Sequence, residues 1–535
     1  MFYDMTTATQ LRFPSLRLSP LATLATGVVL AAAIPLLYVV WNSLQLSGQQ
    51  WAGLWTSRLP ALLWNTLSLA VLVAIGSVLL GVSSAWLIAR REFAGRRLAV
   101  WLMVLPLTVP TYVFAHIYTT LLEEDGWLGR LWIALTGSDR YLPDLFNVWG
   151  TGLILTLAGF SYVFLLAHSA LGVSTRSLEE AARIQGASRA EVFWRINLPL
   201  LRPAIAAALA VVVLHVLSDF GAVSMLQYQT FTLSIYLQMS GRFDYQAAAG
   251  LSLVLVLLSL TFLLLERFFR SRQRYYSTRQ PRRQPRRRAT ALETGLIWAW
   301  LGLITLLAFG LPLAWMLSWS WVAWQERLID AEFWGYARNS LLVAVLAASV
   351  GLVAALPVAL YHARKRNLLG GALLQLSSVG FVLPGPVIAL GILSFFLAQL
   401  PLLYGGLAAL VIALVIRFLP LAVQSQDAAM AQLTPSLEQA SRSLGAGPLE
   451  TLWHVTLPMI RGGLATAWVL VFIDALKELP ATLILRPTGF DTLPVRIWIE
   501  ASEEMLELAA PAALMLVIGT LPVLWILLRG ERRGA

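Results

Sequence analysis

The stretch LEEAARIQGASRAEVFWRINLPLLR, residues 178–202, is polar and lies between two apolar runs, and a similar stretch, LEQASRSLGAGPLETLWHVTLPMIR, occupies residues 437–461. Gly186 and Gly445 are 259 positions apart (445 − 186), close to half of the 535-residue chain. Counted from each glycine, a β-branched residue stands at +10, Leu-Pro at +12 and +13, and arginine at +16. A fixed internal period indicates a repeat architecture, so we interpret the chain as two copies of one unit.

Each polar stretch is expected to form a short helix, a tight turn and a second short helix. Residues 179–185 are good helix formers, and Gly186 can adopt the positive φ that ends a helix. Ser188 stands three residues before Glu191, which predicts a cap at the start of the second helix. Several apolar side chains remain available for burial against a partner: Ile184, Val192, Phe193, Trp194 and Ile196.

The composition is that of a membrane protein. Apolar residues make up 58% and charged residues 13%, against about 45–50% and about 25% in soluble chains. The absence of cysteine excludes disulfides, zinc–thiolate sites and cysteine nucleophiles. The net charge of +11 comes from arginines clustered at the ends of apolar runs. That pattern favours cytoplasmic loops of a membrane protein over a nucleic-acid-binding face.

About twelve membrane spans are expected, six in each half and in the same orientation. They lie near residues 21–40, 62–88, 98–122, 149–171, 203–225, 247–268, 294–317, 339–363, 372–397, 405–423, 462–485 and 506–528. The positions of the arginine clusters place both termini and both polar stretches on the cytoplasmic side. The predicted organisation is a cytoplasmic N-terminal segment (1–20), a first membrane unit (21–268), an arginine-rich cytoplasmic linker (269–292), a second membrane unit (293–529) and a cytoplasmic tail (530–535).

The two halves also match inside the spans. Asn65-Thr66-Leu67 corresponds to Asn339-Ser340-Leu341, and Val109-Pro110 to Leu383-Pro384, in both cases 274 positions apart. Proline inside an apolar run predicts a kink, which can serve as a hinge or only as a packing feature.

Two carboxylates stand at equivalent places within the predicted spans, Asp219 and Glu478. Charges within spans usually face a cavity or a partner, and hard cations prefer oxygen ligands. The pair is therefore a candidate part of a substrate path near the periplasmic mouth. The alternative is that they pair with neighbours such as Lys477 or reach the lipid headgroups, and Asp474 is placed to pair with Lys477 at i,i+3.

The motif Glu180-Ala181-Ala182, Gly186 and Ile196-Asn197-Leu198-Pro199 resembles the signature (EAA) loop of binding-protein-dependent ABC importer permeases. The second copy keeps the spacing but has Gln439-Ala440-Ser441 in place of Glu-Ala-Ala. The resemblance covers essentially the whole chain and implies an all-α polytopic fold, that of type I ABC importer permeases with two fused units. It implies that each loop is a coupling helix on an ATPase subunit. The coupling residues would be Glu179, Glu180, Ala181, Ala182, Gly186, Ile196, Leu198, Pro199, Glu438, Gln439, Ala440, Gly445, Val455, Leu457 and Pro458.

The resemblance also implies the partners: two copies of an ATP-binding subunit, which would hold ATP and Mg, and a periplasmic substrate-binding protein, in a bacterial inner membrane. The chain itself has no G-x-x-x-x-G-K-[ST] motif, so we expect no cofactor in it. In the family, the loop glutamate can pair with the ATPase; Glu180 matches that position, and Gln439 replaces it in the second copy. The alternative for Glu179, Glu180 and Glu438 is a solvated charge at a helix start, stabilised by the helix dipole.

The substrate is expected to be ferric iron, because three stretches resemble ferric iron permeases: residues 65–70, residues 218–223 and residues 477–487. Thiamine, a polyamine or another small solute are alternatives, and a secondary transporter, which also uses duplicated spans, is a more remote one. No nucleophile–base arrangement occurs, so no catalytic residue and no enzyme activity are assigned. The five histidines are scattered without metal-ligand spacing, so no metal ligand is assigned.

Overall fold

The computed structural model describes residues 19–138, 144–172, 182–271, 287–365 and 367–533. This part of the chain is helical apart from turns and two strands of two residues each, β1 (Arg91–Glu92) and β2 (Arg287–Arg288). The predicted all-α fold is confirmed.

The first half consists of α1 (Pro20–Leu44), α2 (Gly48–Ser57), α3 (Leu59–Arg90), α4 (Arg96–Val104), the 3₁₀ turn η1 (Leu105–Thr108), α5 (Thr111–Leu122), α6 (Trp127–Thr136), α7 (Val148–Gly172), α9 (Arg189–Val192), the π-helical turn η2 (Phe193–Asn197), α10 (Leu198–Ser218), α11 (Gly221–Met225), α12 (Phe231–Ser240) and α13 (Tyr245–Ser271).

The second half consists of α14 (Ala291–Thr305), η3 (Leu306–Gly310), α15 (Leu311–Gln325), α16 (Ala331–Arg364), α17 (Leu368–Ser377), α18 (Val379–Val382), α19 (Gly385–Gln399), η4 (Pro401–Leu403), α20 (Leu407–Met430), α21 (Pro435–Ser443), α22 (Pro448–Thr451), η5 (Leu452–Thr456), α23 (Leu457–Met459), α24 (Arg461–Leu476), α25 (Pro480–Leu485), α26 (Leu493–Ser502) and α27 (Leu506–Arg533).

Within the described residues, eight helical segments are long and apolar enough to cross a membrane, and two bent pairs bring the number to ten. One pair, Arg96–Thr108 with Thr111–Thr136, is bent by 94°, and the other, Pro448–Met459 with Arg461–Leu476, by 74°. The two remaining predicted spans, 372–397 and 506–528, coincide with shorter apolar helices. The chain is thus polytopic, as predicted.

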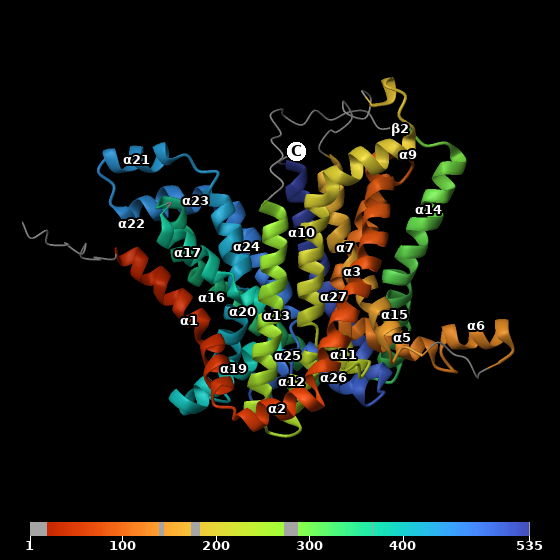
Figure 1. Cartoon of the computed structure of the whole chain (residues 1–535), viewed down its shortest axis with the longest axis horizontal. Coiled ribbons are helices and arrows are strands. Elements are labelled where there is room, and N and C mark those ends of the chain that lie inside the picture. Colours follow the sequence, from red (N-terminus) through yellow and green to blue (C-terminus); the bar gives the residue numbers. More distant parts are fainter. Residues whose placement is uncertain (1–18, 139–143, 173–181, 272–286, 366, 534–535) are drawn as a thin grey trace, which may run out of the picture.

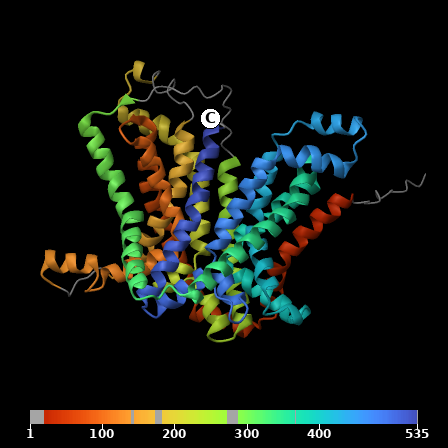
Figure 2. The same cartoon turned by 180° about the vertical axis from the view of Figure 1, so that it is seen from behind.

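The two repeated loops lie at the same end of the helical bundle, α21 and α22 on one flank and α9 on the other (Figure 1). We call this end the loop side and the opposite end the far side. Helix α1 begins and α27 ends toward the loop side (Figure 1), and the view from behind shows the same arrangement (Figure 2).

The first helix of each half packs against the other half. Helix α1 contacts α16, α17 and α19, whereas α14 contacts α3 and α4. Gly391 of α19 makes the first crossing close, because a Cβ atom there would lie 2.4 Å from the Cα atom of Pro35. This exchange of helices joins the two halves into one bundle.

Four predicted spans are interrupted. Pro110 and Pro384 stand at helix starts, after η1 and α18, so both predicted kinks are full breaks. The predicted span 203–225 is also wrong in its extent, because α10 ends at Ser218 and the short α11 starts at Gly221. The equivalent break separates α24 from α25. Apolar composition continues through these breaks, which is why periodicity alone does not reveal them.

The end of the arginine-rich linker is fixed to the first half. Strand β2 pairs in parallel with β1, and Glu293 lies 3.8 Å from Arg91 and 3.3 Å from Arg287. The indole of Trp298 donates a hydrogen bond to the carbonyl oxygen of Ala94 at 2.9 Å. The predicted extended linker thus ends in an ordered anchor, while residues 272–286 lie outside the described part.

Candidate functional site: two repeated loops and a central cavity

The first loop is described from Ala182 onward; Glu179, Glu180 and Ala181 lie outside the described residues. Gly186 has φ +89°, as a helix-ending glycine requires. The predicted cap is present: the Glu191 amide donates to Ser188 Oγ at 3.2 Å, and the Ser188 amide donates to Glu191 Oε2 at 2.9 Å. These hydrogen bonds with Ser188 hold the pKa of Glu191 below its usual value.

The second loop has the same design. Helix α21 ends at Ser443, and Gly445, two residues later, has φ +93°. Pro458, like Pro199 in the first loop, occupies the first turn of the helix after the π-helical turn, with Leu457 and Leu198 just before them. Ile196 and Val455 lie within the π-helical turns η2 and η5. Gln439 and Ala440 are exposed on α21, and Ala182 is half-buried.

Both loops present bulky apolar side chains to solvent. Trp194 and Trp453 occupy the same position relative to the glycine (+8) and are 64% and 62% exposed. Beside the turns, Ile184 and Leu444 are 88% and 89% exposed. Val192, by contrast, is buried within the chain. Exposed apolar residues at matching places in both repeats indicate two equivalent contact surfaces.

Glu438 is engaged inside the chain. Its carboxylate accepts hydrogen bonds from Arg364 Nε at 3.1 Å, Arg364 Nη2 at 3.0 Å and Thr456 Oγ1 at 2.9 Å. Partial burial opposes ionisation, but the hydrogen bonds from Arg364 and Thr456 outweigh it and lower the pKa of Glu438. The carboxylate stands in the first turn of α21, as expected, but it is not a solvated charge; it fixes the loop to the end of α16.

The first half has a matching contact. Arg90, which is 274 positions before Arg364 (364 − 90), donates from Nη2 to Asn197 Oδ1 at 3.1 Å. Asn197 and Thr456 both stand at +11 from their loop glycine and both are buried. In the first half, therefore, the arginine that ends the long helix binds the +11 residue directly, whereas in the second half Glu438 links Arg364 to the +11 residue.

A cavity of about 200 Å³ lies where the halves meet. Positions that are 259 apart line it in pairs: Ala158 and Arg417, His215 and Asp474, Ser218 and Lys477, Asp219 and Glu478. Because equivalent positions of both halves line the same cavity, the cavity lies between the two copies of the repeat. The first half supplies one acidic side chain to these pairs, and the second supplies two acidic and two basic ones.

The two candidate carboxylates are brought to this cavity, and both cap the short helix that follows. Asp219 Oδ1 accepts hydrogen bonds from the amides of Ala222 at 3.0 Å and Val223 at 3.3 Å. Glu478 accepts from the amides of Ala481 at 2.9 Å and Thr482 at 3.0 Å. A carboxylate at a helix start is favoured by the free amides and by the helix dipole.

Their remaining partners differ. Thr111 Oγ1 donates to Asp219 Oδ2 at 2.6 Å, whereas Arg417 Nη1 lies 3.4 Å from Glu478 Oε1. Lys477 does not pair with Glu478: its Nζ lies 4.0 Å from Asp474 and donates to the carbonyl oxygen of Leu107 at 3.1 Å. The expected Asp474–Lys477 pair is present. Among the described residues, no group of three His, Cys, Asp or Glu side chains could hold a metal ion.

Arg417 and Arg364 were not among the predicted site residues. Arg417 stands alone within the apolar run 407–423, and a lone charge in a span is itself a signal of a partner or a cavity. Arg364 carries no such signal, because an arginine at the end of a span is ordinary.

Comparison with known proteins gives a consistent result. The family model described as "Binding-protein-dependent transport system inner membrane component" matches residues 77–275 and 347–533. Fe(3+)-transport system permease protein FbpB 2 of Haemophilus influenzae is 33% identical over 91% of this chain and 94% of its own length. Ferric transport system permease protein FbpB of Actinobacillus pleuropneumoniae is 25% identical over 79% of this chain and 64% of its own. Sulfate transport system permease protein CysT of Escherichia coli is 29% identical, over 46% of this chain and 92% of its own.

Proposed function

This chain belongs to the family of inner-membrane components of binding-protein-dependent transport systems, and we propose that it is the permease through which an ABC ATPase drives the import of ferric iron. A periplasmic binding protein delivers the substrate to the far side. The loop side and both termini face the cytoplasm, because the arginine clusters at the span ends lie there.

The main support for docking of an ATPase is the pair of equivalent loop surfaces. Trp194 and Trp453 are exposed at the same place in each repeat, and each loop is held to a membrane-crossing helix by an arginine. Two equivalent surfaces fit two copies of one ATP-binding subunit. ATP and Mg bind to those subunits, since this chain has no phosphate-binding G-x-x-x-x-G-K-[ST] motif.

The ferric iron substrate is supported by relatives whose names state iron transport. The alignment with one of them, FbpB 2 of Haemophilus influenzae, covers 94% of its length. Asp219 and Glu478 belong to the path, as part of the cavity that the substrate crosses. Their carboxylates suit a hard cation. Sulfate is the competing candidate: the sulfate permeases are also similar, and Arg417 and Lys477 in the same cavity suit an oxyanion.

The test is reconstitution of the purified chain with its ATPase subunit and binding protein in liposomes. We expect co-purification of the ATPase, ATP hydrolysis that the binding protein stimulates, and uptake of ⁵⁵Fe(III). Parallel arms with ³⁵S-sulfate, ¹⁴C-thiamine and a labelled polyamine should show no ATP-driven uptake. An ATPase that does not bind the chain would overturn the transport mechanism, and uptake of sulfate or thiamine alone would overturn the substrate.

A further inference from the structure

The repeated Asn-Thr-Leu and Asn-Ser-Leu motifs have no role in docking or in the cavity, yet the structure gives both the same contact. Asn65 Nδ2 donates to the carbonyl oxygen of Gln229 at 3.0 Å, and Asn339 Nδ2 donates to that of Asp491 at 2.9 Å. Gln229 and Asp491 stand just before α12 and α26, on the far side. Each asparagine therefore fastens a long helix, α3 or α16, to the segment that follows the cavity.

These same two helices end at the arginines that hold the loops. Arg90 is the last residue of α3, and Arg364 is the last residue of α16. From Asn339 to Arg364 the helix covers 25 residues, or about 38 Å at 1.5 Å per residue. Both long helices are thus fastened at one end to a coupling loop and at the other to the far side.

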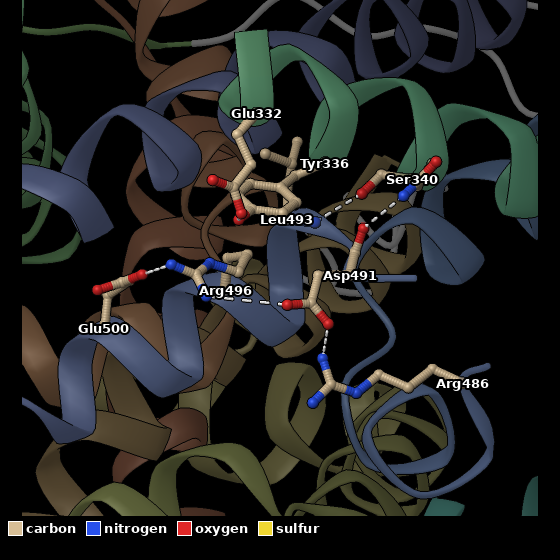
Figure 3. A network of polar contacts seen from close by, with 9 residues as sticks. Glu332, Tyr336, Ser340, Arg486, Asp491, Leu493, Arg496 and Glu500 are labelled. Carbon is tan, nitrogen blue, oxygen red and sulfur yellow. Dashed lines mark hydrogen bonds and ion pairs between the residues drawn. The ribbon is translucent and has the colours of Figure 1, made fainter. Parts of the chain in front are cut away.

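The second half, whose contacts are drawn in Figure 3, has more of these contacts than the first. Beside the Asn339 contact, the Leu493 amide donates to Ser340 Oγ at 2.7 Å, and the guanidinium of Arg496 lies 4.8 Å from the Tyr336 ring. Asp491 in turn is ion-paired with Arg486. In the first half, the Oγ1 of Thr66, which corresponds to Ser340, has no hydrogen-bond partner among the described residues.

The fastened segment leads directly to the cavity. Residues 486–492 join α26 to α25, and Glu478 caps α25 while lining the cavity. Helix α26 also reaches the first half, because Trp498 Nε1 donates to Ser224 Oγ at 3.1 Å. The second loop is also connected to α25 along the chain, through α24. At the start of α24, however, the helical path bends by 74°.

We propose that α3 and α16 act as struts: each transmits movement of its coupling loop to the far side of the bundle, with α16 carrying the larger share. Arg364, Glu438 and Thr456 are the positioning residues at the loop end, and Asn339 and Ser340 are those at the far end. Helix α16 is continuous between its two fastened ends, Pro357 included, and a continuous helix fixed at both ends moves as a unit, so a shift at Glu438 displaces the segment before α26. This inference rests on the proposed function, because the loops must be moved by an ATPase.

The test uses the reconstituted transporter with its ATPase subunit and binding protein, and measures uptake per ATP hydrolysed. Arg364→Leu frees the loop end and Asn339→Leu frees the far end. Each change should lower this ratio about tenfold, within the range of measured allosteric couplings, while ATP hydrolysis and ATPase binding persist. Lys365→Leu removes the neighbouring charge, which has no side-chain contact among those described, and should leave the ratio unchanged.

The double variant Arg364→Leu/Asn339→Leu decides whether the two ends act through one helix. Changes at sites this far apart are normally additive, so independent effects would multiply to about a hundredfold loss. A strut that is already released at one end predicts a double variant close to either single one. A multiplied loss, or single variants with the wild-type ratio, would overturn the proposal.

A charge exchange distinguishes loss of the Arg364–Glu438 contact from a folding defect in Arg364→Leu. Arg364→Glu combined with Glu438→Arg restores an ion pair and should recover much of the ratio, whereas each single exchange should not. No recovery in a correctly assembled double exchange would contradict the proposal. A wild-type assembly without binding-protein-stimulated hydrolysis would instead contradict the proposed function.

Discussion

Replacing Gly445 by alanine should weaken the contact with the ATPase without weakening the helical bundle. Gly445 has φ +93°, a conformation that costs an L-residue about 1–2 kcal/mol. A Cβ atom at this position would meet nothing within 4 Å. The cost is therefore confined to the backbone of the turn, and no packing is lost.

The expected loss of ATPase affinity follows from this backbone cost. If the turn must keep its left-handed glycine to present Leu444 and Trp453, a cost of 1–2 kcal/mol lowers the population of the docking-competent loop about five- to thirtyfold. The apparent affinity for the ATPase subunit should fall by the same factor, because affinity scales with the competent fraction. Gly445→Pro should have a larger effect, since proline holds φ near −65°.

The assay is titration of the ATPase subunit onto the purified chain, together with the thermal unfolding temperature of the chain alone. Gly391→Ala provides the contrast, because its Cβ would lie 2.4 Å from Pro35 Cα. Overpacking of that kind costs about 1–3 kcal/mol, so this variant should unfold at a lower temperature. Gly462→Ala, a helical glycine with free space around it, is the silent control. Wild-type ATPase affinity in Gly445→Ala would refute the reasoning.

Three further outcomes are expected. Glu478→Ala should destabilise the chain by about 3–5 kcal/mol, because it leaves Arg417 in the cavity without its ion pair. Asp219→Ala should destabilise it by only about 0.5–2 kcal/mol, the cost of a lost helix cap. Equal decreases in the unfolding temperature of the two variants would contradict this difference. Because the pKa of Glu438 is lowered in the folded chain from 4.5, its contribution should be complete above about pH 4.5 and be lost as the pH falls through the lowered value. The unfolding temperatures of wild type and Glu438→Gln should therefore differ at pH 7 and converge in acid; a difference that persisted unchanged would count against the Arg364 contact. The variant Leu135→Cys provides a single labelling site, because the chain has no cysteine. A fluorescent label there should be quenched by brominated lipid, since α6 exposes apolar residues at the level of the helix ends. Quenching by aqueous iodide alone would refute the placement of α6 at the membrane surface.

The features that the sequence predicted correctly depend on local chemistry. The period of 259 identified the two loops, and the turn conformation of Gly186 and the cap formed by Ser188 follow from residues within a few positions of each other. Proline in an apolar run also predicted a distortion at Pro110 and Pro384, although the predicted kinks are full breaks.

The features that escaped prediction join distant parts of the chain. Arg364 and Glu438 are 74 positions apart, and the crossing of α1 onto α19 brings Pro35 to Gly391. No short-range pattern carries such information. The spans predicted to run through Asp219 and Glu478 stop there because each carboxylate caps a new helix, an effect that hydropathy does not register.

The central claim is that ATPase subunits act on the two loops from the cytoplasm, and labelling of a single cysteine at Leu444 tests it most directly. A membrane-impermeant maleimide should react with Leu444→Cys in inside-out vesicles, because this side chain is 89% exposed. It should not react in right-side-out spheroplasts, and saturating ATPase subunit should protect it in the vesicles. Reaction from the outside, or a rate in vesicles that the ATPase leaves unchanged, would contradict the account.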